Sequence, residues 1–166
     1  LQTHAMPVED QLNISMLSVG AELGGTKTWE KASVTSSLNY EHLGPYMKLL
    51  PQYRNWELEP RAVTGDVSFR LKTGESGMLK LYSTASRSRL ATLETNLDVP
   101  GSYYTYTLVN DNYYTNVSWN GEIAPDWILS TAFSYTRNRD DISVDSMNIK
   151  EHLRGTHAKI AIRHRI

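Results

Sequence analysis

Hydrophobic side chains recur at every second position through much of this chain, and residues 63–72 give the clearest example. Valine, glycine, phenylalanine and leucine occupy the odd positions, whereas threonine, serine and the charged residues Asp66, Arg70 and Lys72 occupy the even positions. Successive side chains of a strand point to opposite faces, and no helical spacing of apolar residues explains this stretch. The pattern therefore predicts a β-strand with one apolar face and one polar face.

The same alternation predicts about seven strands, each close to the roughly 9–11 residues with which a tilted strand crosses a bilayer. These stretches are residues 18–24, 33–40, 63–72, 79–87, 112–120, 127–135 and 157–163. A short helix is an expected exception around Leu90, Leu93 and Leu97. The expected fold class is all-β, as an antiparallel up-and-down transmembrane β-barrel segment.

The connections between these strands are expected to alternate in length. Short connections fall near residues 28–31, 73–77 and 124–126, where glycine and Pro-Asp suit tight reversals. Long connections cover residues 43–61, 88–111 and 139–151. Transmembrane barrels have short periplasmic turns and longer extracellular loops, so this alternation favours a barrel over a water-soluble meander or sandwich.

Tryptophan and tyrosine gather at opposite ends of the expected strands. Trp29, Trp119 and Trp127 lie beside short connections, and Tyr40, Tyr113 and Tyr135 lie toward long ones. Both ring types prefer the membrane–water interface, because one end of the ring is apolar and the other forms hydrogen bonds. These six residues are therefore expected interface aromatics. At about 3.3 Å per residue and a tilt of about 40°, the stretch from Trp127 to Tyr135 rises roughly 20 Å, slightly less than the ~25 Å apolar band of such barrels.

The composition excludes several functional classes. The chain has 166 residues, a formal net charge of −1 and no cysteine. The near-zero charge argues against a general nucleic-acid binder, and the absence of cysteine excludes a disulfide scaffold, an iron–sulfur site and a thiol nucleophile. The longest apolar runs have three residues, far fewer than the ~20 that a transmembrane helix needs.

An odd number of strands does not suit a closed bacterial barrel, whose strand number is generally even, and lipid does not tolerate an open sheet edge. We therefore expect residues 1–166 to form a partial outer-membrane β-barrel domain without a plug, with residues 1–11 as the tail of a preceding loop. One miscounted strand would instead allow a small, complete eight-stranded barrel with a structural or adhesive role. A soluble β-sheet binding module stays open as well, because half-buried sheets in water also alternate.

Several stretches carry a family resemblance. Residues 40–52 read YEHLGPYMKLLPQ and are followed by Trp56 and Pro60, and residues 112–119 read NYYTNVSW. Together with parts of residues 65–82 and 127–138, they resemble the barrel of TonB-dependent outer-membrane receptors, especially those common in Bacteroidetes. The resemblance covers most of the chain as a style of strand and loop. It implies the C-terminal-side portion of a 22-stranded barrel that encloses a plug domain.

The resemblance also implies a location and partners. Such receptors lie in the bacterial outer membrane and import a scarce nutrient with force relayed by TonB. The implied partners are the lipid bilayer, the plug domain and remaining barrel strands of the same receptor, the TonB system indirectly, and an unknown small nutrient ligand. Nucleic acid is not among them. Neither a plug nor a TonB-contact segment can be matched in residues 1–166.

No catalytic constellation is found in the sequence, so neither enzymatic activity, a cofactor nor a metal site is expected. The five histidines fall in no ligand frame, and Asp140, Asp141 and Asp145 are expected as solvated acids rather than calcium ligands. Weak ligand-binding candidates are the loop aromatics Trp56, Tyr103, Tyr104 and Tyr106. The three tyrosines could stack on a ring-bearing ligand or project from strands above the membrane. Lys72, Lys80, Lys159 and Arg163 are expected to line a wet interior.

Overall fold

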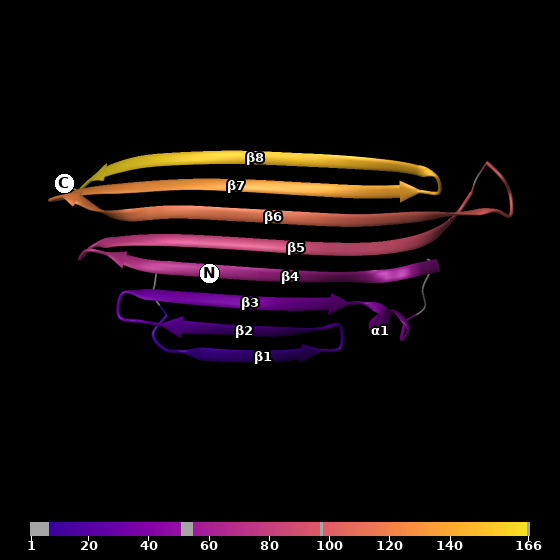
Figure 1. The fold of residues 1–166 in the computed structure, drawn as a ribbon, viewed down its shortest axis with the longest axis horizontal. Helices are drawn as coiled ribbons and strands as arrows, with labels where there is room; N and C mark the ends of the chain where they lie inside the picture. Colours follow the sequence, from indigo (N-terminus) through magenta and orange to yellow (C-terminus); the bar gives the residue numbers. More distant parts are fainter. Residues whose placement is uncertain (1–6, 51–54, 97, 166) are drawn as a thin grey trace.

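The computed structural model describes residues 7–50, 55–96 and 98–165, which form one antiparallel sheet of eight strands. The strands are β1 (Gln11–Leu17), β2 (Gly20–Thr28), β3 (Ala32–His42), β4 (Asn55–Thr73), β5 (Gly77–Thr95), β6 (Tyr103–Ala124), β7 (Trp127–Val144) and β8 (Met147–His164). Each strand pairs with its neighbours in sequence, so the order in space is β1 to β8 (Figure 1). The predicted all-β fold of antiparallel, up-and-down strands is therefore confirmed.

The two ends of the sheet differ in their connections. We call one end the loop end, on the right in Figure 1, because it holds the short helix α1 (Gly44–Met47) and the connection at residues 96–102. The opposite, turn end holds the connections at residues 29–31, 74–76 and 125–126. Within the described ranges, no helix has the length and apolar character needed to cross a membrane.

Residues that tolerate a left-handed backbone close the tight reversals. At the turn end, Gly74 has a φ of 77° and Asp126 a φ of 64°. At the loop end, Asp145 has a φ of 49° in the two-residue turn between β7 and β8. Glycine and aspartate adopt this conformation more readily than most residues, so these positions fix where the chain reverses.

The prediction of seven strands is wrong by one. Residues 11–17 form β1, in which Leu12, Ile14 and Met16 alternate with polar residues over a single short stretch. Eight is an even number, yet the sheet is not closed into a barrel. In the described part of the chain, β1 pairs with β2 alone and β8 pairs with β7 alone.

The predicted long connections are mostly strand. Strands β4 to β8 contain 19, 19, 22, 18 and 18 residues, and they take up most of residues 88–111 and 139–151. The predicted alternation of short and long connections is therefore only partly correct. The helix predicted around Leu90, Leu93 and Leu97 is also wrong, since Leu90 and Leu93 belong to β5 and Leu97 lies outside the described residues. A spacing of three places Leu90 and Leu93 on opposite faces of a strand.

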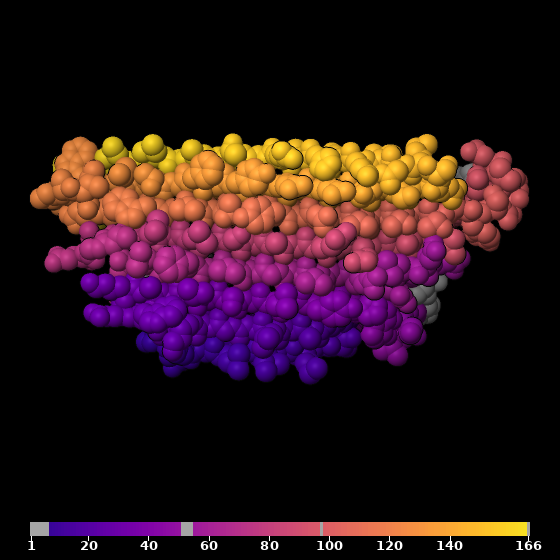
Figure 2. All heavy atoms as spheres, viewed as in Figure 1, coloured from indigo at the N-terminus to yellow at the C-terminus, as the bar shows by residue number. Residues whose placement is uncertain are grey.

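A single layer leaves the sheet without a core of its own. Among the described residues, Ala91 is the one buried hydrophobic residue, whereas Ile14 is 71% exposed and Ile160 is 76% exposed. Figure 2 shows the strands as adjacent bands from indigo β1 to yellow β8, with no second layer over the visible face. Exposed apolar area on this scale marks a surface that meets lipid or a partner.

Candidate functional site: an apolar face with oblique borders

One face of the sheet, which we call the apolar face, carries hydrophobic side chains on every strand. Direct cross-strand partners form rows, and side chains of one row lie on the same face. One such row crosses six strands and consists of Val34, Phe69, Leu81, Val117, Phe133 and Ala158. β1 and β2 extend this face with Ile14 and its direct partner Leu23. The apolar face is therefore continuous from β1 to β8.

The opposite face, which we call the polar face, is hydrophilic along the matching rows. The row one residue away consists of Thr35, Ser68, Tyr82, Asn116, Ser134 and His157. Side chains on this face bond across strands, since Tyr82 Oη donates to Asp66 Oδ1 at 2.7 Å and Ser37 Oγ donates to Asp66 Oδ2 at 3.3 Å. The alternation predicted from the sequence thus becomes two chemically different surfaces.

Amides and carboxylates continue the polar face toward the loop end. Asn110 Nδ2 donates to Asn138 Oδ1 at 2.8 Å, and Asn138 Nδ2 donates to Asp140 Oδ2 at 3.2 Å. Asn112 Nδ2 also donates to Asn138 Oδ1, at 3.3 Å. These bonds join the side chains of β6 and β7 into a ladder, in which Asp140 is a hydrogen-bond acceptor.

The four basic residues predicted to line a wet interior all lie on the polar face. Lys80, Lys159 and Arg163 border a hollow of about 560 Å³ near the turn end, together with serine and asparagine side chains. Lys72 follows Arg70 on the same face of β4. The register therefore groups these cations on the polar face.

The apolar face ends in charged residues toward the loop end. On each of the five long strands, the first charged side chain after the hydrophobic stretch is an arginine or an aspartate. These residues are Arg61, Arg87, Asp111, Arg137 and Arg154, on β4 to β8 in order. The strands continue beyond this border, and hydrophobic side chains recur there on the opposite face, where one cross-strand row consists of Leu90, Leu108, Ile142 and Ile149.

This border runs obliquely across the strands. The row of cross-strand partners that starts at Arg61 in β4 ends at Lys150 in β8. The border residue of β8, however, is Arg154, which lies four residues nearer the turn end. The tyrosines show the same shift. The row through Tyr40 in β3 reaches Arg139 in β7, whereas Tyr135 lies four residues nearer the turn end.

The slope of the border gives the strand tilt at which the border would be level. Both shifts span four strand-to-strand steps, so each border moves by about one residue per strand. With a rise of about 3.3 Å per residue and about 4.8 Å between strands, a level border requires strands tilted by about 35°. Strands of transmembrane barrels tilt by about 35–45°. The charged border of the apolar face is therefore level for strands tilted as in a membrane barrel.

The predicted interface aromatics lie either at the charged border or near the turn end. Tyr113 and Tyr135 lie at the charged border with ring centroids 6.2 Å apart, and Tyr40 lies at the same border on β3. Trp119 and Trp127 lie near the turn end, and the Trp127 ring centroid is 4.6 Å from that of His164. Trp29 lies in the connection between β2 and β3 and is 54% exposed.

The indole of Trp119 is held in place by its neighbours. Its Nε1 donates a hydrogen bond to Thr73 Oγ1 at 2.8 Å. A Cβ atom added to Gly121 would lie 2.7 Å from Trp119 Cζ2 and 2.9 Å from the Cα atom of Gly77. Glycine at position 121 thus leaves the space in which the indole lies.

The predicted ligand-binding aromatics belong to strands rather than loops. Trp56 in β4 and Tyr106 in β6 are both direct partners of Thr92 in β5, which is only 1% exposed. Tyr104 is the direct partner of Glu94 and lies on the same face of the sheet as Tyr106, whereas Tyr103 lies on the opposite face. Sequence reasoning missed Thr92, because only the cross-strand register shows that it joins the two aromatic residues.

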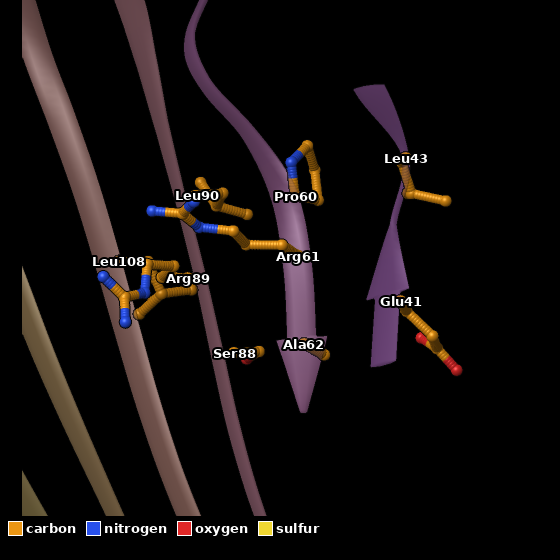
Figure 3. Close-up of a pocket in the computed structure, with 9 residues that line it drawn as sticks. All are labelled: Glu41, Leu43, Pro60, Arg61, Ala62, Ser88, Arg89, Leu90 and Leu108. Atoms are coloured by element: carbon orange, nitrogen blue, oxygen red, sulfur yellow. The ribbon is translucent and has the colours of Figure 1, made fainter. Parts of the chain in front are cut away.

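A small hollow lies beside this cluster, near α1. It measures about 190 Å³ and is bordered by Leu43, which follows β3, and by residues of β3 to β6, including Pro60 and Leu108 (Figure 3). In Figure 3 the cross-strand partners Arg61 and Arg89 extend to one side of the strands, away from Glu41. Trp56 Nε1 and Arg61 Nε are buried and have no hydrogen-bond partner among the described residues.

Asp10 attaches the chain before β1 to the end of β2. Its carboxylate accepts hydrogen bonds from Lys27 Nζ and, at 2.8 Å each, from the backbone nitrogen and Oγ1 of Thr28. The bond from Lys27 and those from Thr28 lower the pKa of Asp10 from 3.8 to about 2. The carboxylate therefore stays ionised, and keeps these bonds, at pH values where an unpaired aspartate is protonated.

Within residues 7–50, 55–96 and 98–165, no three histidine, aspartate or glutamate side chains are grouped so that they could hold a metal ion. Neither a protein-family model, nor a curated protein, nor a solved structure matches this chain.

Proposed function

We propose that this chain forms part of the wall of a transmembrane β-barrel in a bacterial outer membrane. The apolar face then contacts lipid, and the polar face is directed toward the barrel interior. The observation that carries this proposal is the oblique border of the apolar face. It becomes level when the strands are tilted by about 35°, within the range of membrane barrels.

The border also argues against a soluble binding module. A water-soluble sheet packs its apolar face against a second layer. Nothing then requires the edge of the apolar face to be level across the strands. Tyrosines at the charged border and tryptophans near the turn end match the aromatic girdles of a bilayer. The apolar face, left exposed by the single layer, gains a partner in the lipid chains.

Within that class, we propose a TonB-dependent receptor that imports a scarce nutrient, as the sequence resemblance implies. The hairpins of β4 to β8 continue beyond the border at the loop end, as extracellular extensions of such barrels do. The open sheet favours this receptor over a small complete barrel, because the latter needs direct pairing of β1 with β8. The plug domain and further strands would then come from other parts of the same receptor.

Spin-label accessibility along β7 tests the wall. Because the chain has no cysteine, single cysteines at positions 129–136 can each be labelled in the protein reconstituted into phospholipid bilayers. We expect collisions with oxygen, which concentrates in lipid, to be several-fold more frequent at Phe133→Cys than at Ser134→Cys, with a period of two. Arg139→Cys, beyond the border, is the matched control and is expected to collide preferentially with a water-soluble nickel complex. Equal oxygen collisions at positions 133 and 134 would contradict the proposal.

Receptor activity is tested separately in the host cell. Loss of the protein and loss of TonB are each expected to abolish growth on the same limiting nutrient, and the double loss is expected to be no more severe. A nutrient at high concentration serves as the control, because diffusion then replaces import. Growth that requires the protein but is indifferent to TonB would rule out the receptor while leaving the barrel wall intact.

A further inference from the structure

The border of the apolar face carries a dense group of basic side chains, which we call the cationic belt. It consists of Arg61, Arg87, Arg89, Arg137, Arg139, Lys150 and Arg154. The same rows present two carboxylates on this face, those of Asp111 and Asp141. The belt lies directly beyond Tyr113 and Tyr135, on the face that the proposed function directs toward lipid.

Two pairs of arginines in this belt stand directly opposite each other. Arg137 in β7 is the direct partner of Arg154 in β8, and Arg61 in β4 is the direct partner of Arg89 in β5. Like charges directly opposite each other destabilise a sheet. An anion bound between each pair would remove this repulsion.

The available carboxylates are already engaged elsewhere. Arg87 Nε lies 3.4 Å from Asp111 Oδ1, and Arg139 Nη2 lies 3.4 Å from Asp141 Oδ2. In the part of the chain that the structure describes, Arg137 and Arg154 form no ion pair. Both side chains are exposed, so they are accessible to an anion from outside the protein.

The surroundings of Arg137 form a shallow hollow. It measures about 220 Å³ and is bordered by Asp111, Asn112, Tyr113, Arg137 and Arg139. Tyr113 is the direct partner of Arg137 on the side opposite Arg154. The hollow thus combines the ring of a border tyrosine with guanidinium groups, and it opens on the apolar face.

We infer that the Arg137–Arg154 pair binds the phosphate of an anionic lipid headgroup in the adjoining membrane leaflet. Guanidinium groups bind phosphate oxygens in pairs, and the level just beyond interface tyrosines is that of the headgroups. This inference rests on the proposed function, because it needs the apolar face to be in lipid.

Binding of a phosphorylated glycolipid to the purified protein in detergent tests the inference. The probes are diphosphoryl lipid A, its dephosphorylated form, and inorganic phosphate, with bound lipid counted by native mass spectrometry. We expect the doubly substituted Arg137→Gln/Arg154→Gln protein to bind diphosphoryl lipid A about tenfold to thirtyfold more weakly, from ~1 kcal/mol per basic side chain. The parent protein and the doubly substituted protein are expected to bind the dephosphorylated lipid with equal affinity.

The matched control removes two positive charges from the polar face, as Arg70→Gln/Arg163→Gln. It is expected to bind diphosphoryl lipid A as tightly as the parent protein. An equal loss in the control would overturn the inference, because the effect would then reflect net charge. Inorganic phosphate that binds as tightly as the lipid would overturn the assignment to a headgroup. Unchanged lipid binding by Arg137→Gln/Arg154→Gln would also overturn it.

The spin-label experiment separates this inference from the proposed function. One outcome is that position 133 contacts lipid while the protein binds diphosphoryl and dephosphorylated lipid A equally well. In that case the headgroup site is overturned and the barrel wall stands. If position 133 does not contact lipid, both are overturned. Strand content by circular dichroism shows whether each variant is folded before its binding is compared.

Discussion

Arginine in place of Val117 is expected to destabilise the membrane-inserted protein by about 2–4 kcal/mol. Val117 lies on the apolar face midway between Tyr113 and Gly121 on β6, and its direct partners are Leu81 and Phe133. In the proposed orientation, its side chain meets the middle of the lipid layer, where an uncompensated charge is most costly. Denaturant-induced unfolding in phospholipid vesicles, followed by tryptophan fluorescence, measures the change in the free energy of unfolding.

The neighbouring residue supplies the control for this substitution. Asn116 lies one position away on the polar face, between Tyr82 and Ser134. Asn116→Arg introduces the same charge into hydrophilic surroundings and is expected to change the free energy of unfolding by less than about 0.5 kcal/mol. Comparable losses in the two variants would show that the apolar face is not in lipid.

Alanine in place of Gly121 is expected to destabilise the sheet by about 1–3 kcal/mol. The added Cβ would lie 2.7 Å from the Trp119 ring and 2.9 Å from the Gly77 backbone, closer than carbon atoms can approach. The indole must then move, and its hydrogen bond to Thr73 Oγ1 is lost. The same unfolding measurement gives the free energy, and displacement of Trp119 is expected to shift the combined tryptophan emission of the folded protein.

Gly65→Ala is the matched control, because Gly65 lies in β4 on the same face of the sheet as Gly121. Its added Cβ would meet nothing nearer than the Ser37 carbonyl oxygen at 3.9 Å. Replacing this glycine restricts the unfolded chain, so the expected change is neutral or a gain of up to about 1 kcal/mol. A loss in Gly65→Ala as large as that in Gly121→Ala would indicate a general intolerance of side chains rather than the contact with Trp119.

The sequence predicts the two faces well where only one of them is hydrophobic. Phe69 and Arg70 alternate as expected, and Tyr113, Trp119, Trp127 and Tyr135 lie at the ends of the apolar face. The prediction fails beyond the charged border, where hydrophobic and polar residues no longer alternate regularly. Residues 137–141 read RNRDD, and a stretch without a hydrophobic period cannot be distinguished from a loop by alternation. Alternation alone therefore predicts long connections where the structure has long hairpins.

The group formed by Trp56, Thr92 and Tyr106 illustrates a second limit of prediction from the sequence. Trp56 and Tyr106 are recognisable from the sequence as aromatic candidates, but their common partner is not. A register shift in β4 between Trp56, Leu58 and Arg61 determines which residue of β5 faces Trp56. Such irregularities have no hydrophobic signature, so the position of Trp56 relative to Thr92 follows only from the three-dimensional structure.

The neighbour-to-neighbour pairing of all eight strands also bears on how the sheet assembles. Each pairing closes a short stretch of chain, except that between β3 and β4, so the loss of loop entropy per strand is small. Non-local contacts slow folding because distant segments must meet first. A meander avoids this until its outermost strands find partners. We therefore expect the sheet to grow hairpin by hairpin. In the proposed larger barrel, the slow event would be the pairing of β1 and β8 with further strands.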